Sequence, residues 1–269
     1  MARSVAPTIP LGVALMMGVV RVALLVSAIA LLASCGGAQI ERLTVSVVAQ
    51  HPHDPQAFTQ GLVWQDGSLY ESTGLLGASS LRETRLDGEV VRYRPLARDL
   101  FGEGLALVGD ELLQLTWQNG LLLRYDLATF EPLGSQPYTG EGWGLCFDGQ
   151  ALWMSDGSAT LTRRDPVTFA ALSSVTVRRG RTPVTQLNEL ECVAGFVYAN
   201  VWKSDEIMRI DAKTGAVVAV IDGAPLRRLM GAMDSEAVLN GIAFMESTGN
   251  YLLTGKLWPT MFEVKFVAQ

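Results

Sequence analysis

Histidine and cysteine are scarce in this sequence: only His51 and His53, and only Cys35, Cys146 and Cys192, occur among 269 residues. The two histidines lie two positions apart in a proline-rich segment, and no spacing of cysteine and histidine matches a zinc site. A histidine-ligated metal centre is therefore not expected, and we predict neither a metal nor any other cofactor. A chain of this length can bury a large core, so we do not expect a scaffold that depends on disulfides.

Basic residues are also few. The chain has 21 Lys and Arg against 27 Asp and Glu, which gives a formal net charge of −6. Removal of an amino-terminal segment that contains Arg3 and Arg21 would make this charge −8. Because an acidic chain without a basic cluster binds nucleic acid poorly, we expect no nucleic-acid partner.

The sequence contains no hydrophobic run long enough to favour a transmembrane helix. The apolar run from Val22 to Leu32, which follows Arg21, is too short to span a bilayer and has the layout of a secretory signal peptide. Its end, Leu32-Ala33-Ser34-Cys35, resembles the lipobox of bacterial lipoproteins, in which the signal is cleaved before a cysteine that is then lipidated. The alternative is an ordinary cleaved signal with an incidental Cys35.

This pattern predicts the domain organisation. We expect a signal peptide at 1–34, a linker at 35–42 that begins with lipidated Cys35, and a single domain at 43–269. The protein is then expected to lie in the bacterial cell envelope as a periplasm-facing or surface lipoprotein. Its only attachment to the membrane would be the lipid anchor, and we expect a monomer.

The mature chain contains a motif that occurs five times. Polar or aromatic groups precede an apolar strand pattern, which is followed by a turn signal and a second strand. A fixed period of about 40 to 50 residues is typical of a repeated four-stranded blade. The five junctions are Phe58-Thr59-Gln60-Gly61-Leu62, Phe101-Gly102-Glu103-Gly104-Leu105, Glu141-Gly142-Trp143-Gly144-Leu145, Leu187-Asn188-Glu189-Leu190 and Leu239-Asn240-Gly241-Ile242.

Four repeats have four strand patterns each, but the fifth ends after Met261–Val267 and lacks its outer strand. Leu43–Ala49 has the alternation of a spare strand, and pairing it with the last repeat would remove an exposed edge. The sequence thus predicts an all-β fold: a five-bladed β-propeller closed by an N-terminal strand that pairs into the last blade. The longest connection, Asp222–Leu239, is expected to be a solvated loop rather than a short helix.

Cys146 and Cys192 each follow the start of a strand pattern in neighbouring repeats. Most cysteines in such positions are small buried hydrophobic residues. We therefore predict free thiols and regard a Cys146–Cys192 bridge as the less favoured alternative.

Glu103 lies between Gly102 and Gly104 at the head of the strand pattern 105–108. Glycines let another backbone or a ligand come close, so the Glu103 carboxyl is the polar group offered at this point. Poor solvation raises the pKa of a carboxyl and makes it a candidate proton shuttle near neutral pH. The alternative is a turn glutamate that accepts hydrogen bonds from backbone amides.

In a propeller the first strands line a central channel, so all five junctions converge at one mouth of it. Side chains far apart in the sequence would then share one pocket, with two tryptophans at the ends of second strands on its rim. The junction residues are Gln60, Glu103, Trp143, Asn188 and Asn240, and the rim residues are Trp117 and Trp202.

Ordered motifs carry a family resemblance across nearly the whole mature chain. They include Pro52-His53-Asp54-Pro55, Phe58-Thr59-Gln60-Gly61-Leu62, Phe101-Gly102-Glu103-Gly104, Leu115-Thr116-Trp117, Gly142-Trp143-Gly144-Leu145, Leu187-Asn188-Glu189-Leu190-Glu191, Ala199-Asn200-Val201-Trp202, Leu239-Asn240-Gly241-Ile242 and Thr254-Gly255-Lys256-Leu257-Trp258-Pro259. From His51 to Val264 the chain resembles the plant and bacterial type of glutaminyl-peptide cyclotransferase.

The resemblance implies a five-bladed propeller and a metal-independent acyltransferase. Its substrates would be peptides or proteins with an N-terminal glutamine, which is converted to pyroglutamate with release of ammonia. Glu103 would be the general acid and base. The implied substrate-binding residues are Phe58, Gln60, Phe101, Trp117, Trp143, Asn188, Trp202 and Lys256. For each aromatic residue the alternative is ordinary propeller core.

Two other functions are compatible with such a fold. One is a non-catalytic envelope propeller that binds peptides or partner proteins. The other is a metal-dependent propeller hydrolase such as a lactonase, for which the candidate ligands would be Glu103, Glu141, Glu189, Asn188 and Asn240. A carboxyl at position 103 favours the cyclotransferase over the binding protein.

Overall fold

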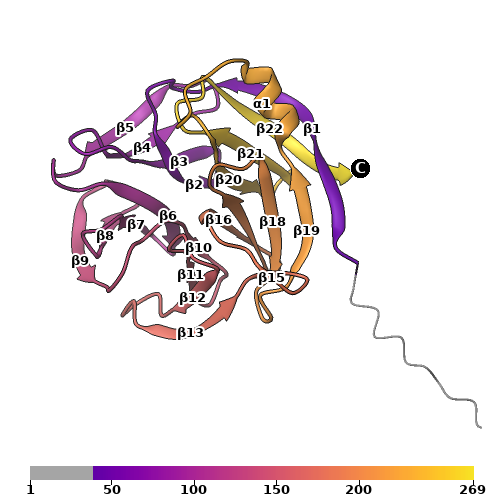
Figure 1. Cartoon of the computed structure of the whole chain (residues 1–269). Helices are drawn as coiled ribbons and strands as arrows, with labels where there is room; N and C mark the ends of the chain where they lie inside the picture. Colours follow the sequence, from indigo (N-terminus) through magenta and orange to yellow (C-terminus); the bar gives the residue numbers. More distant parts are fainter. Residues whose placement is uncertain (1–38) are drawn as a thin grey trace, which may run out of the picture. The chain divides into compact units, whose positions relative to one another are not determined.

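The structure is a computed structural model that describes residues 39–269. This part of the chain is built almost entirely of β-strands, with one short helix (Figure 1). None of its helices is both long and apolar enough to cross a membrane. The predicted signal peptide 1–34 and Cys35 lie outside the described residues.

Three four-stranded antiparallel sheets follow one another along the chain, and in each the strands keep their sequence order. The first sheet has β2 (Thr59–Gln65), β3 (Ser68–Thr73), β4 (Ser80–Thr84) and β5 (Val90–Pro95); the second has β6 (Gly102–Val108), β7 (Glu111–Thr116), β8 (Leu121–Asp126) and β9 (Pro132–Pro137); the third has β10 (Leu145–Phe147), β11 (Leu152–Met154), β12 (Thr160–Arg164) and β13 (Ala171–Thr176).

The remaining strands form one eight-stranded sheet. Its order is β16 (Leu187–Val193), β17 (Phe196–Val201), β18 (Glu206–Asp211), β19 (Val217–Asp222), β1 (Glu41–Pro52), β22 (Thr260–Ala268), β21 (Asn250–Gly255) and β20 (Leu239–Met245). The predicted strands thus occur in the predicted order, and most differ from the prediction only at their ends.

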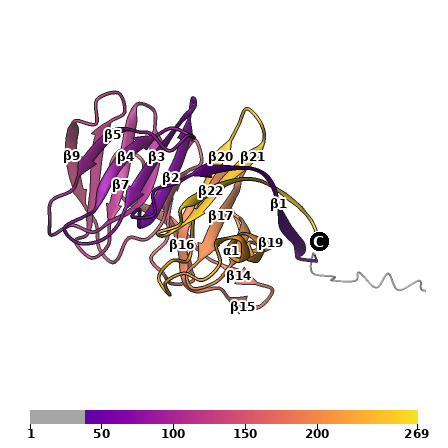
Figure 2. The same ribbon diagram turned by 90° about the horizontal axis from the view of Figure 1, so that it is seen from above.

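The amino-terminal strand β1 lies between β19 and β22 (Figures 1 and 2). It pairs antiparallel with β22, with Val45 opposite Phe266 and Ala49 opposite Glu263, which confirms the predicted pairing of the chain's two ends. It also pairs in parallel with β19, from Glu41 opposite Ala219, which was not predicted. Both edges of β1 are therefore hydrogen-bonded, and the strand begins two residues earlier than the sequence pattern indicated.

The first strands of the repeats lie innermost and contact one another in a closed ring: β2 touches β6, β6 touches β10, β10 touches β16, β16 touches β20, and β20 touches β2. Glycines allow this approach. A Cβ atom on Gly104 would lie 2.4 Å from the Leu145 nitrogen, and one on Gly144 would lie 2.0 Å from the Asn188 carbonyl oxygen. The junctions of the repeats therefore meet at one end of the inner strands, as predicted.

The same inner strands supply part of the core. One aliphatic residue near the start of each strand is at most 1% exposed. They are Leu62, Leu105, Leu145, Leu190 and Ile242. Burying such side chains removes apolar surface from water, which stabilises the fold and fixes the positions of the polar residues just before them.

Two elements depart from the predictions. Within the connection expected to be a loop, α1 (Ala224–Met230) forms because a proline lies in its first turn and Leu226 is fully buried, so one side of the segment packs on the sheet. A small hairpin of β14 (Arg178–Arg179) and β15 (Thr182–Pro183) was not predicted. Its strands have two residues each, too few to show an alternating pattern.

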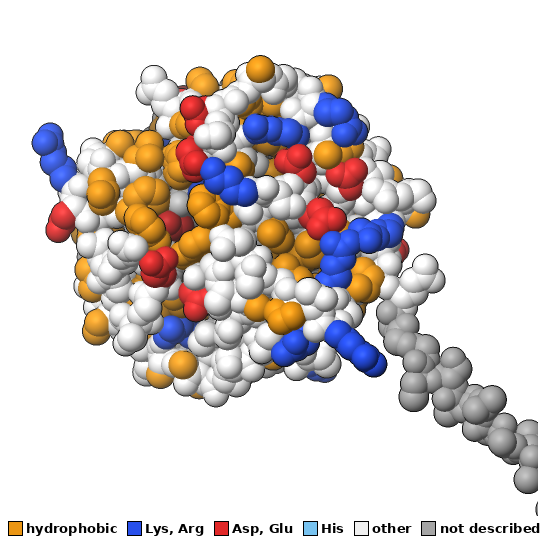
Figure 3. Space-filling view, viewed as in Figure 1, with side chains coloured by type: hydrophobic (Ala, Val, Ile, Leu, Met, Phe, Trp, Pro, Cys, Tyr) orange, Lys and Arg blue, Asp and Glu red, His pale blue; other side chains and the backbone are white. Residues whose placement is uncertain are grey.

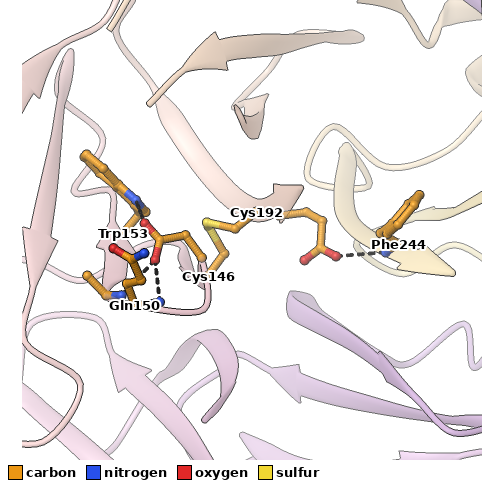
Figure 4. The surroundings of a disulfide bond; sticks show 8 residues. Cys146, Gln150, Trp153, Cys192 and Phe244 are labelled. Atoms are coloured by element: carbon orange, nitrogen blue, oxygen red, sulfur yellow. Dashed lines mark hydrogen bonds between the residues drawn. A yellow bond between two sulfur atoms is a disulfide. The ribbon is translucent and has the colours of Figure 1, made fainter. Parts of the chain in front are cut away.

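The prediction of free thiols was wrong. Cys146 in β10 and Cys192 in β16 form a disulfide with a Cα–Cα distance of 5.5 Å. Both residues lie on neighbouring inner strands, so the fold brings them together although 46 positions separate them in the sequence. Figure 4 shows this bond beside Trp153 and Gln150 on one side and Phe244 on the other.

The surface carries charges of both signs. Figure 3 shows Lys and Arg side chains interspersed with Asp and Glu and with hydrophobic residues on the face presented in Figure 1. Charge is therefore mixed on that face rather than segregated.

Candidate active site

Glu103 is the second residue of β6 and is 4% exposed. Neither of its neighbours has room for a side chain, since a Cβ on Gly102 would lie 2.7 Å from the Thr73 carbonyl oxygen and one on Gly104 would meet the backbone of β10. The two glycines therefore hold the carboxyl in the ring of inner strands. Its Oε1 accepts a hydrogen bond from Gln60 Nε2 (2.9 Å).

Burial raises the pKa of Glu103 well above its ordinary value, because the charged form loses its hydration. The positive charge of Lys256 opposes this shift, and the negative charge of Glu141 adds to it. A carboxyl with a raised pKa exchanges a proton more readily near neutral pH than an ordinary glutamate does. Glu103 is thus the residue in this site best suited to move a proton.

The amide of Gln60 is oriented by Asn240 at the start of β20. Asn240 Nδ2 donates to Gln60 Oε1 (3.2 Å) and to the Thr59 carbonyl oxygen (2.9 Å). Since this leaves the amide nitrogen of Gln60 to face Glu103, the three side chains form one buried chain of hydrogen bonds. These hydrogen bonds show that the three side chains lie together, as expected from the convergence of the repeat junctions, although they are far apart in the sequence.

Lys256 follows β21 and is 4% exposed. Its Nζ lies 4.7 Å from the centroid of the Phe58 ring, a cation–π distance. Burial lowers the pKa of Lys256 to about 8, although the charge of Glu103 raises it. A lysine with this pKa is mostly protonated at neutral pH, so its positive charge acts on the Glu103 carboxyl.

The aromatic side chains predicted for the site make edge-to-face contacts with one another. The Phe58 and Phe101 rings are 6.1 Å apart and nearly perpendicular, and Phe101 and Trp117 are 5.7 Å apart at 61°. On the other side Trp143 and Trp202 meet edge to face at 5.8 Å. The five predicted aromatic residues therefore occur in two contacting groups, Phe58–Phe101–Trp117 and Trp143–Trp202.

Glu141 joins the two aromatic groups. Its Oε2 accepts hydrogen bonds from Trp117 Nε1 (2.8 Å) and Trp143 Nε1 (3.1 Å), and its Oε1 accepts one from Gln118 Nε2 (2.9 Å). Glu141 was expected only as a candidate metal ligand, and its bonds to the two indoles were not predicted. The signal available was its position two residues before Trp143.

Asn188 in β16 is 2% exposed, and its carbonyl oxygen accepts a hydrogen bond from Ser155 Oγ (2.7 Å). Its side-chain Oδ1 is buried and has no hydrogen-bond partner within residues 39–269. A buried acceptor without a partner is costly, which is typical of a group that meets a ligand.

The carboxylates considered for a metal site do not converge. Glu189 uses both oxygens on backbone amides, accepting from Leu62 N (3.3 Å) and Ile242 N (2.9 Å). In the described part of the chain no group of three His, Cys, Asp or Glu side chains could hold a metal ion. Of the carboxylates named for a lactonase-type site, Glu189 thus bonds to backbone amides, and Glu141 accepts from indole and amide N–H groups.

Fold and site together describe an all-β protein that has a buried carboxyl with a raised pKa, two hydrogen-bonded amide side chains, a buried lysine and several aromatic rings near the start of its inner strands. A family model described as Glutamine cyclotransferase matches residues 19–266. The glutaminyl-peptide cyclotransferase of Arabidopsis thaliana is 41% identical over 226 residues, which cover 82% of this chain and 71% of the plant protein.

Among solved structures, Myxococcus xanthus glutaminyl cyclase is similar to this chain with a TM-score of 0.82 and 40% sequence identity. The match covers 86% of this chain and 100% of the Myxococcus chain. This chain belongs to the glutamine cyclotransferase family, as the sequence motifs indicated.

Proposed function

We propose that this protein is a glutaminyl-peptide cyclotransferase in which Glu103 is both general base and general acid. The acyltransferase activity follows from the family, and its substrates are peptides or proteins with an N-terminal glutamine. The observation that carries the assignment to Glu103 is its burial between two glycines, with one hydrogen bond from Gln60 and a raised pKa.

The reaction forms one C–N bond and breaks another. The α-amine attacks the carbon of its own side-chain carboxamide, which gives a tetrahedral oxyanion; the original carboxamide nitrogen then leaves as ammonia. Glu103 takes a proton from the attacking amine and gives a proton to the departing nitrogen, so one carboxyl serves both steps. No oxidant, metal or second substrate is required by this balance.

The remaining side chains orient the substrate. The attack is intramolecular, so holding the glutamine side chain folded back toward its amine supplies much of the rate. Flat walls from Phe101, Trp117 and Trp143 suit that task. Asn188 Oδ1 is a free acceptor for the carboxamide N–H, and Lys256 stabilises the developing oxyanion.

The direct test is to incubate the purified protein with a dipeptide that begins with glutamine, and to measure ammonia release and the mass of the product. We expect a product lighter by one ammonia, and undiminished turnover after treatment with a chelator. A dipeptide that begins with asparagine is a suitable control, because its shorter side chain would have to close a strained four-membered ring. A folded protein without turnover would contradict the proposal and favour a peptide-binding function.

We also propose that the domain is a five-bladed β-propeller. The support is the ring of five inner strands, β2, β6, β10, β16 and β20, each of which starts a run of antiparallel strands. In this interpretation β1 completes the fifth blade and joins it to the fourth, which merges the two into the eight-stranded sheet. An experimental structure with a different number of sheets around the centre would contradict it.

The envelope location is likewise a proposal, supported by the apolar run and lipobox-like sequence before Cys35. In this proposal the mature protein begins with lipidated Cys35, is a monomer, and is held to the membrane only by its lipid. Mass spectrometry of the protein isolated from a bacterial envelope tests the site of cleavage. Residues upstream of Cys35 in the mature protein would contradict it, and light scattering tests the monomer.

A further inference from the structure

We infer that Glu141 is a positioning residue: its carboxylate fixes the two tryptophans of the pocket wall relative to each other and places a negative charge beside Glu103. The inference rests on the proposed role of Glu103. Its first basis is that a single oxygen, Oε2, accepts from the indole N–H groups of both Trp117 and Trp143.

Backbone hydrogen bonds already fix the main chain around Trp117 and Trp143, so the Glu141 carboxylate acts on the positions of their side chains. Trp117 N donates to the Phe101 carbonyl (3.0 Å), Gly142 N donates to the Trp117 carbonyl (3.0 Å), and Gly104 N donates to the Trp143 carbonyl (2.7 Å). These bonds join the backbone next to Glu103 to both tryptophans. The rotation of each indole ring is restrained by its packing on Phe101 or Trp202 and by the shared carboxylate oxygen, which is the contact that links the two indoles to each other.

The charge of Glu141 is held in place as well. Hydrogen bonds from Gln118 first, and then from Trp143 and Trp117, lower the pKa of Glu141, so it is ionised at neutral pH. The charges that act on Glu103 are those of Lys256 and Glu141. Lys256 is also affected by the charges of Glu236 and Lys203, and Tyr138 by those of Glu103 and Arg164. Lys256 favours the ionised form of Glu103, whereas Glu141 favours the neutral form. Neutralising Glu141 therefore lowers the pKa of Glu103.

Two variants separate the positioning effect from the charge effect. Glu141→Asp keeps the charge, but its side chain is one methylene shorter and cannot keep the same bonds to both indoles. Glu141→Gln keeps the length but loses the charge, and its amide presents an N–H₂ group. We expect each to lower kcat/KM by about tenfold or more, since small misplacements of positioning groups cost up to about 10²-fold.

The pH profile distinguishes the two variants, because the titration of the substrate amine is common to all of them. With Glu141→Gln the acid limb of kcat/KM should move to lower pH, and with Glu141→Asp it should stay where the wild type has it. Both variants should also change the tryptophan fluorescence emission, since two indole N–H groups lose their acceptor geometry. A merely structural role would not move the acid limb.

Asp148→Asn is the matched control. Asp148 follows the last residue of β10, and its Oδ2 accepts from Trp153 Nε1 at 2.8 Å, a similar carboxylate–indole bond. Trp153 lies beside the Cys146–Cys192 disulfide (Figure 4). This variant should change the emission of Trp153 while kcat/KM and its pH profile stay within twofold of wild type.

The inference is overturned if the Glu141→Gln variant folds, its kcat/KM is within twofold of the wild-type value, and the acid limb of its pH profile lies at the same pH as in the wild type. Failure of the Glu141 variants to fold would also contradict it, since the residue would then be structural. Glu103→Gln measured in parallel separates the two hypotheses: if that variant is as active as wild type, it is the proposed role of Glu103 that fails.

Discussion

Two inner strands carry buried glutamates that look alike in sequence and burial but differ in their partners. Glu103 in β6 is 4% exposed and Glu189 in β16 is 1% exposed. Burial raises the pKa of both carboxyls well above the ordinary value. Yet Glu189 accepts from the backbone amides of two other strands, through Leu62 and Ile242, whereas Glu103 accepts one bond from the side chain of Gln60.

The difference shows that a raised pKa alone does not identify a reactive carboxyl. Both oxygens of Glu189 are used to join β16 to β2 and β20, so it serves the closure of the ring. Within residues 39–269 the second oxygen of Glu103 accepts no hydrogen bond. An oxygen left open in a pocket can meet a substrate, and that separates a proton shuttle from a structural acid.

The largest expected effect is that of Glu103→Gln. The amide is nearly the same size, so the fold should be kept, but proton transfer is lost. We expect kcat/KM to fall by about 10²–10⁴-fold, which is about 3–5 kcal/mol of transition-state stabilisation. Steady-state kinetics with a Gln-initiated peptide measure this, and circular dichroism checks the fold. If the variant turns over substrate within a few-fold of the wild-type rate, Glu103 has a structural role like that of Glu189 and is not the proton shuttle.

Removing the disulfide should affect stability and not catalysis. Cys146→Ser with Cys192→Ser releases β10 from β16 at the end of the strands away from Glu103. We expect a loss of about 2–4 kcal/mol in the free energy of unfolding, and kcat/KM within twofold of wild type. Urea unfolding together with kinetics tests both. A large loss of activity in the folded variant would show that the two ends are coupled.

Glu189→Gln is the counterpart of the first prediction. In the wild type the backbone N–H groups of Leu62 and Ile242 each donate to one carboxylate oxygen of Glu189. In the variant one of these N–H groups would face the amide N–H₂ group, which cannot accept a hydrogen bond. A buried donor without a partner costs about 1–3 kcal/mol, so the free energy of unfolding should fall by that amount. Activity per folded molecule should remain within a few-fold of wild type, as thermal unfolding and kinetics would show. A catalytic loss like that of Glu103→Gln would remove the distinction between the two acids.

The smallest effect is expected for Trp143→Phe. The ring remains as a wall, while the hydrogen bond from its indole to Glu141 is lost. Only the orientation of one wall of the site changes and the proton shuttle is kept, so we expect kcat/KM to fall about two- to tenfold, mainly through KM. An effect as large as that of Glu103→Gln would mean that this ring does more than position the substrate.

The pattern of the sequence predicted the strand order, the pairing of β1 with β22 and the meeting of Gln60, Glu103 and Asn240. These follow from alternation, from glycine-flanked junctions and from the unpaired edge of the last repeat. The parallel pairing of β1 with β19 and the Cys146–Cys192 bond were not predictable in the same way. Both depend on which strands become neighbours in space, and the local sequence does not encode that.

The difference between Glu103 and Glu189 could not be predicted from the sequence either. Each is a glutamate near the start of an inner strand. Only the hydrogen-bond partners show that both carboxylate oxygens of Glu189 accept hydrogen bonds, whereas Glu103 accepts one. The contacts of Glu141 were missed for the same reason, because the indole of Trp117 comes from the end of β7, 24 positions earlier in the sequence. The resemblance to the family supplied the site residues that periodicity alone could not, notably Lys256 and Phe58.

The most direct test of the central claim is the ratio of kcat/KM for wild type to that for Glu103→Gln, measured as a function of pH. The ratio cancels the titration of the substrate's own amine, so it reports Glu103 alone. Burial raises the pKa of this carboxyl, so its base form is lost as the pH falls through that raised pKa. We predict that the ratio is large at alkaline pH and falls in one titration centred above 4.5, the ordinary value. A ratio that is constant across the pH range would contradict the assignment of Glu103 as the proton shuttle.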